Sequence, residues 1–136
     1  MTLEAIRDLM RSRLHSEDHF VVYPDTPPTS QAHRVRQIHR AWLPPEEPLL
    51  ALYDDTLFGT GSDGFALTPR RLLWRSFLEH PRQLKWTDLD PSAVDVDDDA
   101  IIVAESRLPT GALRQQEALA ALLQELADVE RAIEAD

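Results

Sequence analysis

Apolar residues recur at spacings of three and four in three segments, and this period predicts three amphipathic helices. The first two stripes are Leu3, Ile6, Met10, Leu14 and Ala32, Val35, Ile38, Trp42. Thr29 or Ser30 is a suitable cap for the second helix, and Pro44 and Pro45 close it. We expect a long third helix to begin at a Thr110 cap and end near Ile133. Its apolar seam is Leu119, Leu122, Leu126, Val129 and Ile133.

The middle of the chain consists of short aliphatic and aromatic runs, which predict strands. These runs are LLALY (49–53), FALT (65–68), LLWRSF (72–77), QLKW (83–86), AVDV (93–96) and AIIVA (100–104). An earlier extended piece, FVVY, precedes Pro24. Turn-forming residues separate the runs, including a tight turn at Thr68–Arg71. Their spacing favours an antiparallel meander that curls into a half-barrel or barrel.

This order of elements predicts an α+β fold. We expect an antiparallel curved sheet or half-barrel with two N-terminal helices and a C-terminal amphipathic helix. A chain of 136 residues is long enough for one ordinary domain. We expect a helical extension over residues 1–22 and the main domain, with its lead-in helix, over residues 23–136.

Composition and charge exclude several classes of function. The chain has no cysteine, which excludes disulfides, thiolate zinc sites and a cysteine nucleophile. Its net charge of −10 works against nucleic acid or an anionic membrane as the main partner. Charges interrupt the apolar positions of the N-terminus, unlike a signal peptide. We therefore expect a cytoplasmic protein whose partner is another protein.

Three motifs resemble sites of chemistry, but each lacks a required feature. The glycines of residues 59–64 match G-x-G-x-x-G, yet a strand follows them where a dinucleotide site needs a helix. The acidic run 95–99 lacks the glycine and glutamate of a calcium loop. His15 and His19 lack a third ligand. We expect no cofactor, no metal and no catalytic residue.

Arginines gather in two segments that are candidates for binding an acidic group. The segment HRVRQIHR (33–40) lies on the second predicted helix, and a second cluster follows Pro69. A carboxylate, a phosphate or an acidic peptide is the ligand that such a basic patch would bind. A solvated helix face is the other interpretation. The candidate binding residues are Arg34, Arg36, Arg40, Arg70, Arg71 and Arg75.

The stretch LLALYDDTLFGTGSDGFALTPRRLLWRS resembles bacterial PH-like (GRAM-like) domains of the pleckstrin-homology-like superfold. The matching positions are Asp55, Thr56, Phe58, Gly59, Asp63, Gly64, Thr68 and Trp74. QLKWTDL and YPDTPPTSQAHRVRQIHR are similar to the family's next strand and lead-in helix, so the similarity covers roughly residues 23–134. The resemblance implies a curved barrel capped by a C-terminal helix and a non-enzymatic module for membranes or proteins. Asp54 and Asp55 stand where lipid-binding members carry basic residues.

Three functional hypotheses follow. The first is a non-enzymatic PH-like binding or scaffolding module that acts through protein–protein contacts. The alternative is a small acidic secretion-type chaperone or adaptor that binds an unfolded partner segment as a homodimer, with the last helix as an interface. An enzyme with a carboxylate site is the third, and it requires a deep pocket in which Asp54 or Asp63 meets Arg70.

Overall fold

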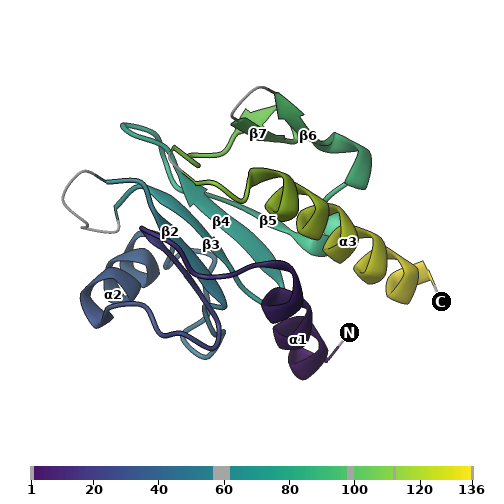
Figure 1. Cartoon of the computed structure of the whole chain (residues 1–136), viewed down its shortest axis with the longest axis horizontal. Coiled ribbons are helices and arrows are strands. Elements are labelled where there is room, and N and C mark those ends of the chain that lie inside the picture. Colours follow the sequence, from purple (N-terminus) through teal and green to yellow (C-terminus); the bar gives the residue numbers. More distant parts are fainter. Residues whose placement is uncertain (1, 57–61, 98–99, 112, 136) are drawn as a thin grey trace.

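The computed structural model describes residues 2–56, 62–97, 100–111 and 113–135. Within these residues the chain forms three α-helices and two antiparallel sheets (Figure 1). The helices are α1 (Leu3–Arg13), α2 (Thr29–Ile38) and α3 (Gln116–Ala135). Two short 3-10 helices, η1 (Trp86–Asp88) and η2 (Pro91–Ala93), connect the sheets. The prediction of an α+β fold with antiparallel strands is confirmed.

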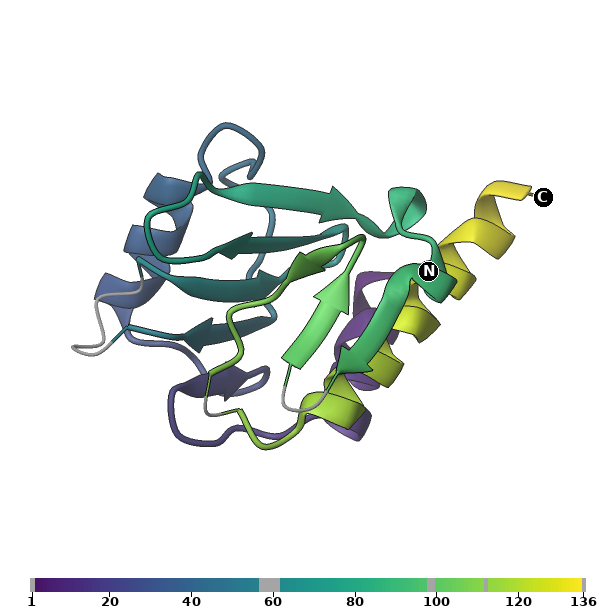
Figure 2. The ribbon, with the colours of Figure 1, turned by 90° about the horizontal axis from the view of Figure 1, so that it is seen from above.

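The larger sheet has five strands in sequence order, β1-β2-β3-β4-β5. They are β1 (Phe20–Val22), β2 (Ala51–Asp54), β3 (Gly64–Leu67), β4 (Arg71–Arg75) and β5 (Arg82–Lys85). The smaller sheet contains β6 (Val94–Asp97), β7 (Ala100–Val103) and β8 (Ser106–Arg107). The two sheets remain separate over the described residues, and their strands do not close into a barrel (Figure 2).

The larger sheet is covered on both faces. Leu72 and Trp74 point into the main core, which α1, α3 and the smaller sheet share. Leu73 points to the opposite face, where it packs with Val35 of α2 and with Leu43. Figure 1 shows α2 on one side of the sheet and α1 and α3 on the other. This double cover explains why β2, β3 and β4 have no alternation of apolar and polar residues.

The described part of the predicted helical extension (residues 1–22) begins at residue 2 and contributes to the same core and the same sheet as the rest. Ile6, Met10 and Leu14 are buried in the main core. Phe20 and Val22 belong to β1, which pairs with β2 in antiparallel register. A hydrogen bond from the Ala5 amide to the Thr2 hydroxyl caps α1 at its N-terminus.

Two predicted helix boundaries are wrong. α2 ends at Ile38, and Trp42 lies in the turn that follows, 39% exposed, where its amide donates to the His39 carbonyl. α3 begins at Gln116. Before it, the Leu113 amide donates to the Thr110 carbonyl and the Leu113 side chain is buried in the main core. Thr110 is itself buried and does not cap the helix.

Candidate functional site

A groove of about 800 Å³ opens between the N-terminal turn of α1, loop 44–48, the β3–β4 turn and η1. Its apolar lining is Leu3, Ile6, Pro44, Pro48, Pro69 and Trp86. Its polar lining is Glu46, Glu47, Arg70, Arg71, Lys85 and Thr87. We call it the Arg70 groove. It brings together segments that lie far apart in the sequence.

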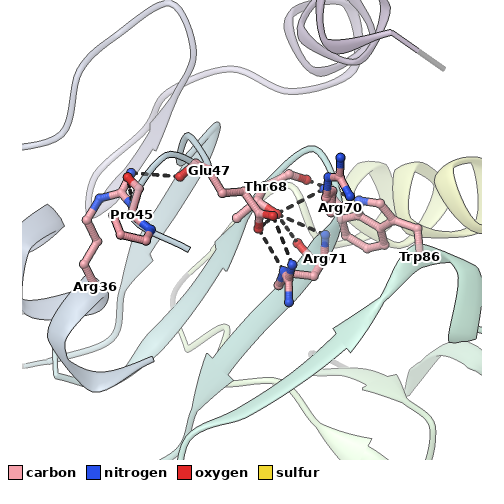
Figure 3. Close-up of polar contacts among 7 residues, drawn as sticks. All are labelled: Arg36, Pro45, Glu47, Thr68, Arg70, Arg71 and Trp86. Carbon is pink, nitrogen blue, oxygen red and sulfur yellow. Dashed lines mark hydrogen bonds and ion pairs between the residues drawn. The ribbon is translucent and has the colours of Figure 1, made fainter. Parts of the chain in front are cut away.

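A buried ion pair forms one wall of the Arg70 groove (Figure 3). Arg71 donates to the two carboxylate oxygens of Glu47 from Nε at 2.8 Å and from Nη2 at 3.0 Å. The Thr68 hydroxyl donates to the same carboxylate at 2.8 Å. The exposed fractions of the Arg71 and Glu47 side chains are 9% and 6%. Bidentate pairing and a third donor are what a buried carboxylate needs. We call Glu47, Thr68 and Arg71 the Glu47 cluster.

Local turn chemistry places Thr68 and Arg71 in this cluster. The Thr68 amide donates to the Arg71 carbonyl at 3.0 Å and closes the predicted turn between β3 and β4. The Thr68 hydroxyl also accepts hydrogen bonds from the amides of Arg70 and Arg71. The hydroxyl is therefore held in place by backbone amides while it donates to Glu47.

Two further side chains fix the cluster from outside. The indole Nε1 of Trp86 donates to the Thr68 carbonyl at 3.2 Å, and the Trp86 side chain is fully buried. Arg36 reaches across from α2 and donates to the Glu47 carbonyl at 2.9 Å. Loop 44–48 is thus tied to both the sheet and α2, so this wall of the groove is preformed (Figure 3).

Arg70 and Lys85 supply the uncompensated charge of the groove. Both residues are exposed and line the groove. Within the part of the chain that the structure describes, neither side chain has a hydrogen-bond or ion-pair partner. Glu46 is the exposed acid on the rim, whereas Glu47 is neutralised by Arg71. The local charge of the groove is therefore positive, on a chain whose net charge is −10.

The candidate arginines do not form one surface. Arg70 and Arg71 line the groove, and Arg36 joins them through Glu47. Arg71 and Arg36 are already bonded within the chain, which leaves Arg70 to face a ligand.

The other three candidate arginines lie elsewhere. Arg34 donates to Gln37 on the exposed side of α2, and Arg40 is exposed beyond the end of that helix. Arg75 ends β4, about 13 Å from Arg71 by strand geometry. There its Nε lies 4.0 Å from an oxygen of Asp63 and donates to the Glu79 carbonyl.

Sequence reasoning missed Glu47 and Lys85 as parts of the site. In the string PPEEP nothing distinguishes buried Glu47 from exposed Glu46. The partners of Glu47 lie 21 and 24 residues away in the sequence. Lys85 could have been included from the sequence, because it is the single lysine of the chain and lies at the end of a predicted strand, close to the Arg70–Arg75 cluster.

A second groove of about 640 Å³ lies between β4, β5 and the segment that follows β7. The guanidinium of Arg82 lies 5.4 Å from the centre of the Trp74 ring and donates to the Ser106 hydroxyl. Asp55 lies on its rim, and burial and then the nearby Asp63 raise the pKa of the Asp55 carboxyl. We call it the Arg82 groove.

The arrangement that the enzyme hypothesis above requires, Asp54 or Asp63 beside Arg70 in one pocket, is not formed among the described residues. Asp63 lies beside Arg75, at the opposite end of β4 from Arg70. Asp54 is buried, and its carboxylate accepts from the Thr56 amide and hydroxyl. Within the described residues no three His, Cys, Asp or Glu side chains are placed to share a metal ion.

The last position of the glycine motif, Gly64, requires a residue without a side chain. Its φ is +140°, and a Cβ at this position would collide with the Tyr53 carbonyl oxygen of the paired strand. Gly59 and Gly61 lie outside the described residues.

Comparison with protein-family models, with curated proteins and with solved structures finds no match to this chain. No helix in the described part of the chain is both long and apolar enough to cross a membrane.

Proposed function

We propose that the chain is a non-enzymatic binding module of the PH-like type, and that the Arg70 groove binds an acidic segment of a partner protein. Two antiparallel sheets with a C-terminal helix packed on η1 and β6 are consistent with the PH-like type. So are the residues of the β2–β4 region that carry the sequence resemblance.

The observation that carries the proposal is a groove with one hydrogen-bonded wall and two cations that have no acidic partner among the described residues, on an acidic chain. Arg70 and Lys85 have no carboxylate partner among the described residues, whereas Arg71 is neutralised by Glu47. An arginine beside a lysine favours a carboxylate-rich ligand, because the guanidinium binds a carboxylate through two parallel hydrogen bonds. The remaining negative charge of the chain repels such a ligand elsewhere and so directs it to this groove.

The groove fits a peptide better than a compact anion. Its accessible apolar surface comes from the partly exposed proline rings of Pro44, Pro48 and Pro69, whereas Trp86 and Ile6 are buried beneath them. Leu3 is 39% exposed at one side and offers an apolar contact to a side chain of the ligand. A free phosphate would use the cations alone and leave this apolar surface in water.

The test is a comparison of labelled peptides that differ in charge alone. We expect a fluorescein-labelled peptide of alternating glutamate and valine to bind, and its lysine–valine counterpart not to bind. Arg70→Glu with Lys85→Glu should abolish binding of the acidic peptide, and added salt should weaken binding to the wild type.

Arg34→Glu with Arg40→Glu is the matched control, because it makes the same change of charge away from the groove. Equal loss of binding in both double variants would show that net charge, and not the groove, attracts the peptide. Failure of the wild type to bind the acidic peptide would overturn the proposed function.

A further inference from the structure

β5 is the last strand of the larger sheet, and one side of its backbone is open (Figure 2). The Trp86 amide donates to the Arg70 carbonyl, which sets the phase of the β4–β5 ladder. In antiparallel pairing every second residue of a strand bonds to its neighbour, so Arg82, Leu84 and Trp86 point their backbone groups toward β4. The backbone amides of Gln83 and Lys85 therefore point away from β4. Within the described residues no hydrogen bond closes the outward Gln83 amide and carbonyl or the outward Lys85 amide.

The outer edge of β1, by contrast, is closed by the chain itself. The Phe20 amide and carbonyl both bond to Glu17. The Val22 amide donates to the Ser16 hydroxyl, and the Val22 carbonyl accepts from the Asp25 amide. An added strand would have to break these bonds.

The outer edge of β6 is closed in a similar way. Gln124 of α3 donates to the Val94 carbonyl at 3.2 Å. The Val96 amide donates to the Asp95 carboxylate at 2.9 Å. Backbone donors and acceptors that are not paired internally need a partner or water, so β5 differs from both β1 and β6.

β5 also connects the two grooves. Lys85, at its end, lines the Arg70 groove, and Arg82, at its start, lines the Arg82 groove. An extended segment paired with β5 would therefore run from one groove to the other. Such a segment would meet Arg70 and Lys85 at one end. At the other end it would meet Arg82, which points to the opposite face of the sheet from Lys85 and lies in a groove that Asp55, Glu79 and Glu105 also line.

The charge of β5 selects the occupant of this edge. The strand carries Arg82 and Lys85 and no acidic residue. Arg82 contacts the neutral side chains of Ser106 and Trp74, and among the described residues it forms no ion pair with the acids of its groove. A second copy of the chain paired edge to edge would bring these cations together, which is unfavourable. An acidic strand would not meet this repulsion.

We propose that the acidic partner segment binds as an additional strand on β5, with its backbone bonded to Gln83 and Lys85. This inference rests on the proposed function and specifies how the segment is held. Main-chain hydrogen bonds would supply affinity, while Arg70 and Lys85 at the end of β5 would select acidic side chains.

The test removes the edge amide without removing a charge. Gln83→Pro removes the backbone N–H of this residue, which forms no hydrogen bond with β4, and an edge strand tolerates proline. The probe is the same labelled peptide of alternating glutamate and valine, about eight residues long so that it spans roughly 26 Å. We expect Gln83→Pro to weaken its binding by about tenfold, the equivalent of a lost hydrogen bond.

Gln83→Ala is the matched control, because it also removes the glutamine side chain but retains the backbone N–H. We expect its affinity to remain within about threefold of the wild-type value. Hydrogen exchange of the wild type provides a second readout that needs no variant. The Gln83 and Lys85 amides should become protected when the peptide binds.

Unchanged affinity of a folded Gln83→Pro protein, or unprotected Gln83 and Lys85 amides in the complex, would overturn strand addition. If Arg70→Glu with Lys85→Glu still abolished binding in that case, the proposed function would stand without it. A wild type that does not bind the acidic peptide would overturn both.

Discussion

At the scale of single residues, Glu47 and Glu46 show how position decides the role of a carboxylate. Glu47 is 7% exposed and accepts hydrogen bonds from Arg71 and Thr68. Glu46, its neighbour, is exposed on the rim of the Arg70 groove. The first holds loop 44–48 against the sheet, whereas the second contributes charge at the surface.

Glu47→Ala should therefore destabilise the fold strongly. Removing this carboxylate leaves the Arg71 guanidinium buried without its partner, which costs roughly 3–5 kcal/mol. Glu46→Ala should change the free energy of unfolding by less than about 0.5 kcal/mol. Urea unfolding of the two variants measures the difference. Similar free energies for both would mean that Arg71 finds another partner or water.

His39 is a second residue whose surroundings set its chemistry. It caps the C-terminus of α2 and is 4% exposed, and its Nδ1 has no hydrogen-bond partner among the described residues. Burial, and then the nearby positive charge of Arg75, lower the pKa of His39 from 6.5 to about 4. The side chain is therefore neutral in the folded protein near pH 7.

Stability should fall as the pH decreases through this interval. The unfolded chain binds the His39 proton near pH 6.5 and the folded chain only near pH 4, so between these values the unfolded state holds more protons. The full difference corresponds to about 3 kcal/mol. His39→Leu should flatten the profile of unfolding free energy between pH 7 and pH 4, relative to wild type.

His33→Leu is the control for this pH profile, because His33 is exposed on α2, the helix that His39 directly follows. It should retain the wild-type slope. The raised pKa of Asp55 has the opposite effect on stability and is common to all three proteins, so it cancels in the comparison. Parallel profiles for wild type and His39→Leu would refute the assignment.

At the scale of elements, α3 is part of the main core. Leu119, Leu122 and Leu126 of the predicted seam are each fully buried. The side chains of Val129 and Ile133, the other two seam positions, lie outside the described set. α3 packs on η1, η2 and β6, and Arg13 of α1 pairs with Glu125.

The seam residues should therefore contribute to folding before they contribute to any interface. Leu122→Ala and Leu126→Ala should each cost roughly 2–5 kcal/mol. Leu126→Asp should abolish cooperative thermal unfolding, while Asp128→Ala, on the exposed side, should leave it unchanged. Circular dichroism and light scattering report both properties. A stable Leu126→Asp monomer from a wild-type dimer would instead favour the chaperone hypothesis.

At the scale of the whole molecule, the chain is acidic overall, and the Arg70 groove is a small positively charged region on it. The chain carries 14 basic and 24 acidic residues, so the Arg70 groove is an exception to the average surface. A peptide small enough to enter the groove meets Arg70 and Lys85 first. A flat membrane of anionic lipid would meet the acidic remainder as well.

We therefore expect no sedimentation with phosphatidylserine vesicles at physiological salt. Long-range repulsion from a net charge of −10 outweighs the cations of one groove. Co-sedimentation with phosphatidylcholine vesicles is the matched measurement for contact that does not depend on charge. Binding to the anionic vesicles alone, weakened by salt, would contradict this expectation and the choice of a peptide as ligand.

The sequence by itself determined the type and order of most elements. Helical spacing predicted α1, α2 and α3, and short apolar runs predicted β2 to β7. The Thr68–Arg71 turn was also predictable. These features depend on neighbouring residues, through side-chain periodicity and turn chemistry. Helix ends were less predictable: α3 begins at Gln116, six residues after the predicted cap Thr110, and Leu113 between them is buried in the main core.

Only the tertiary structure decided which of these residues form a site. The same rules of charge and turn chemistry applied to all six candidate arginines, yet the path of the chain buried Arg71 against Glu47 and left Arg70 free. It also left β5 open while other segments closed the edges of β1 and β6. Contacts between distant segments depend on how the elements pack, because the residues around a position do not specify which distant residue will contact it.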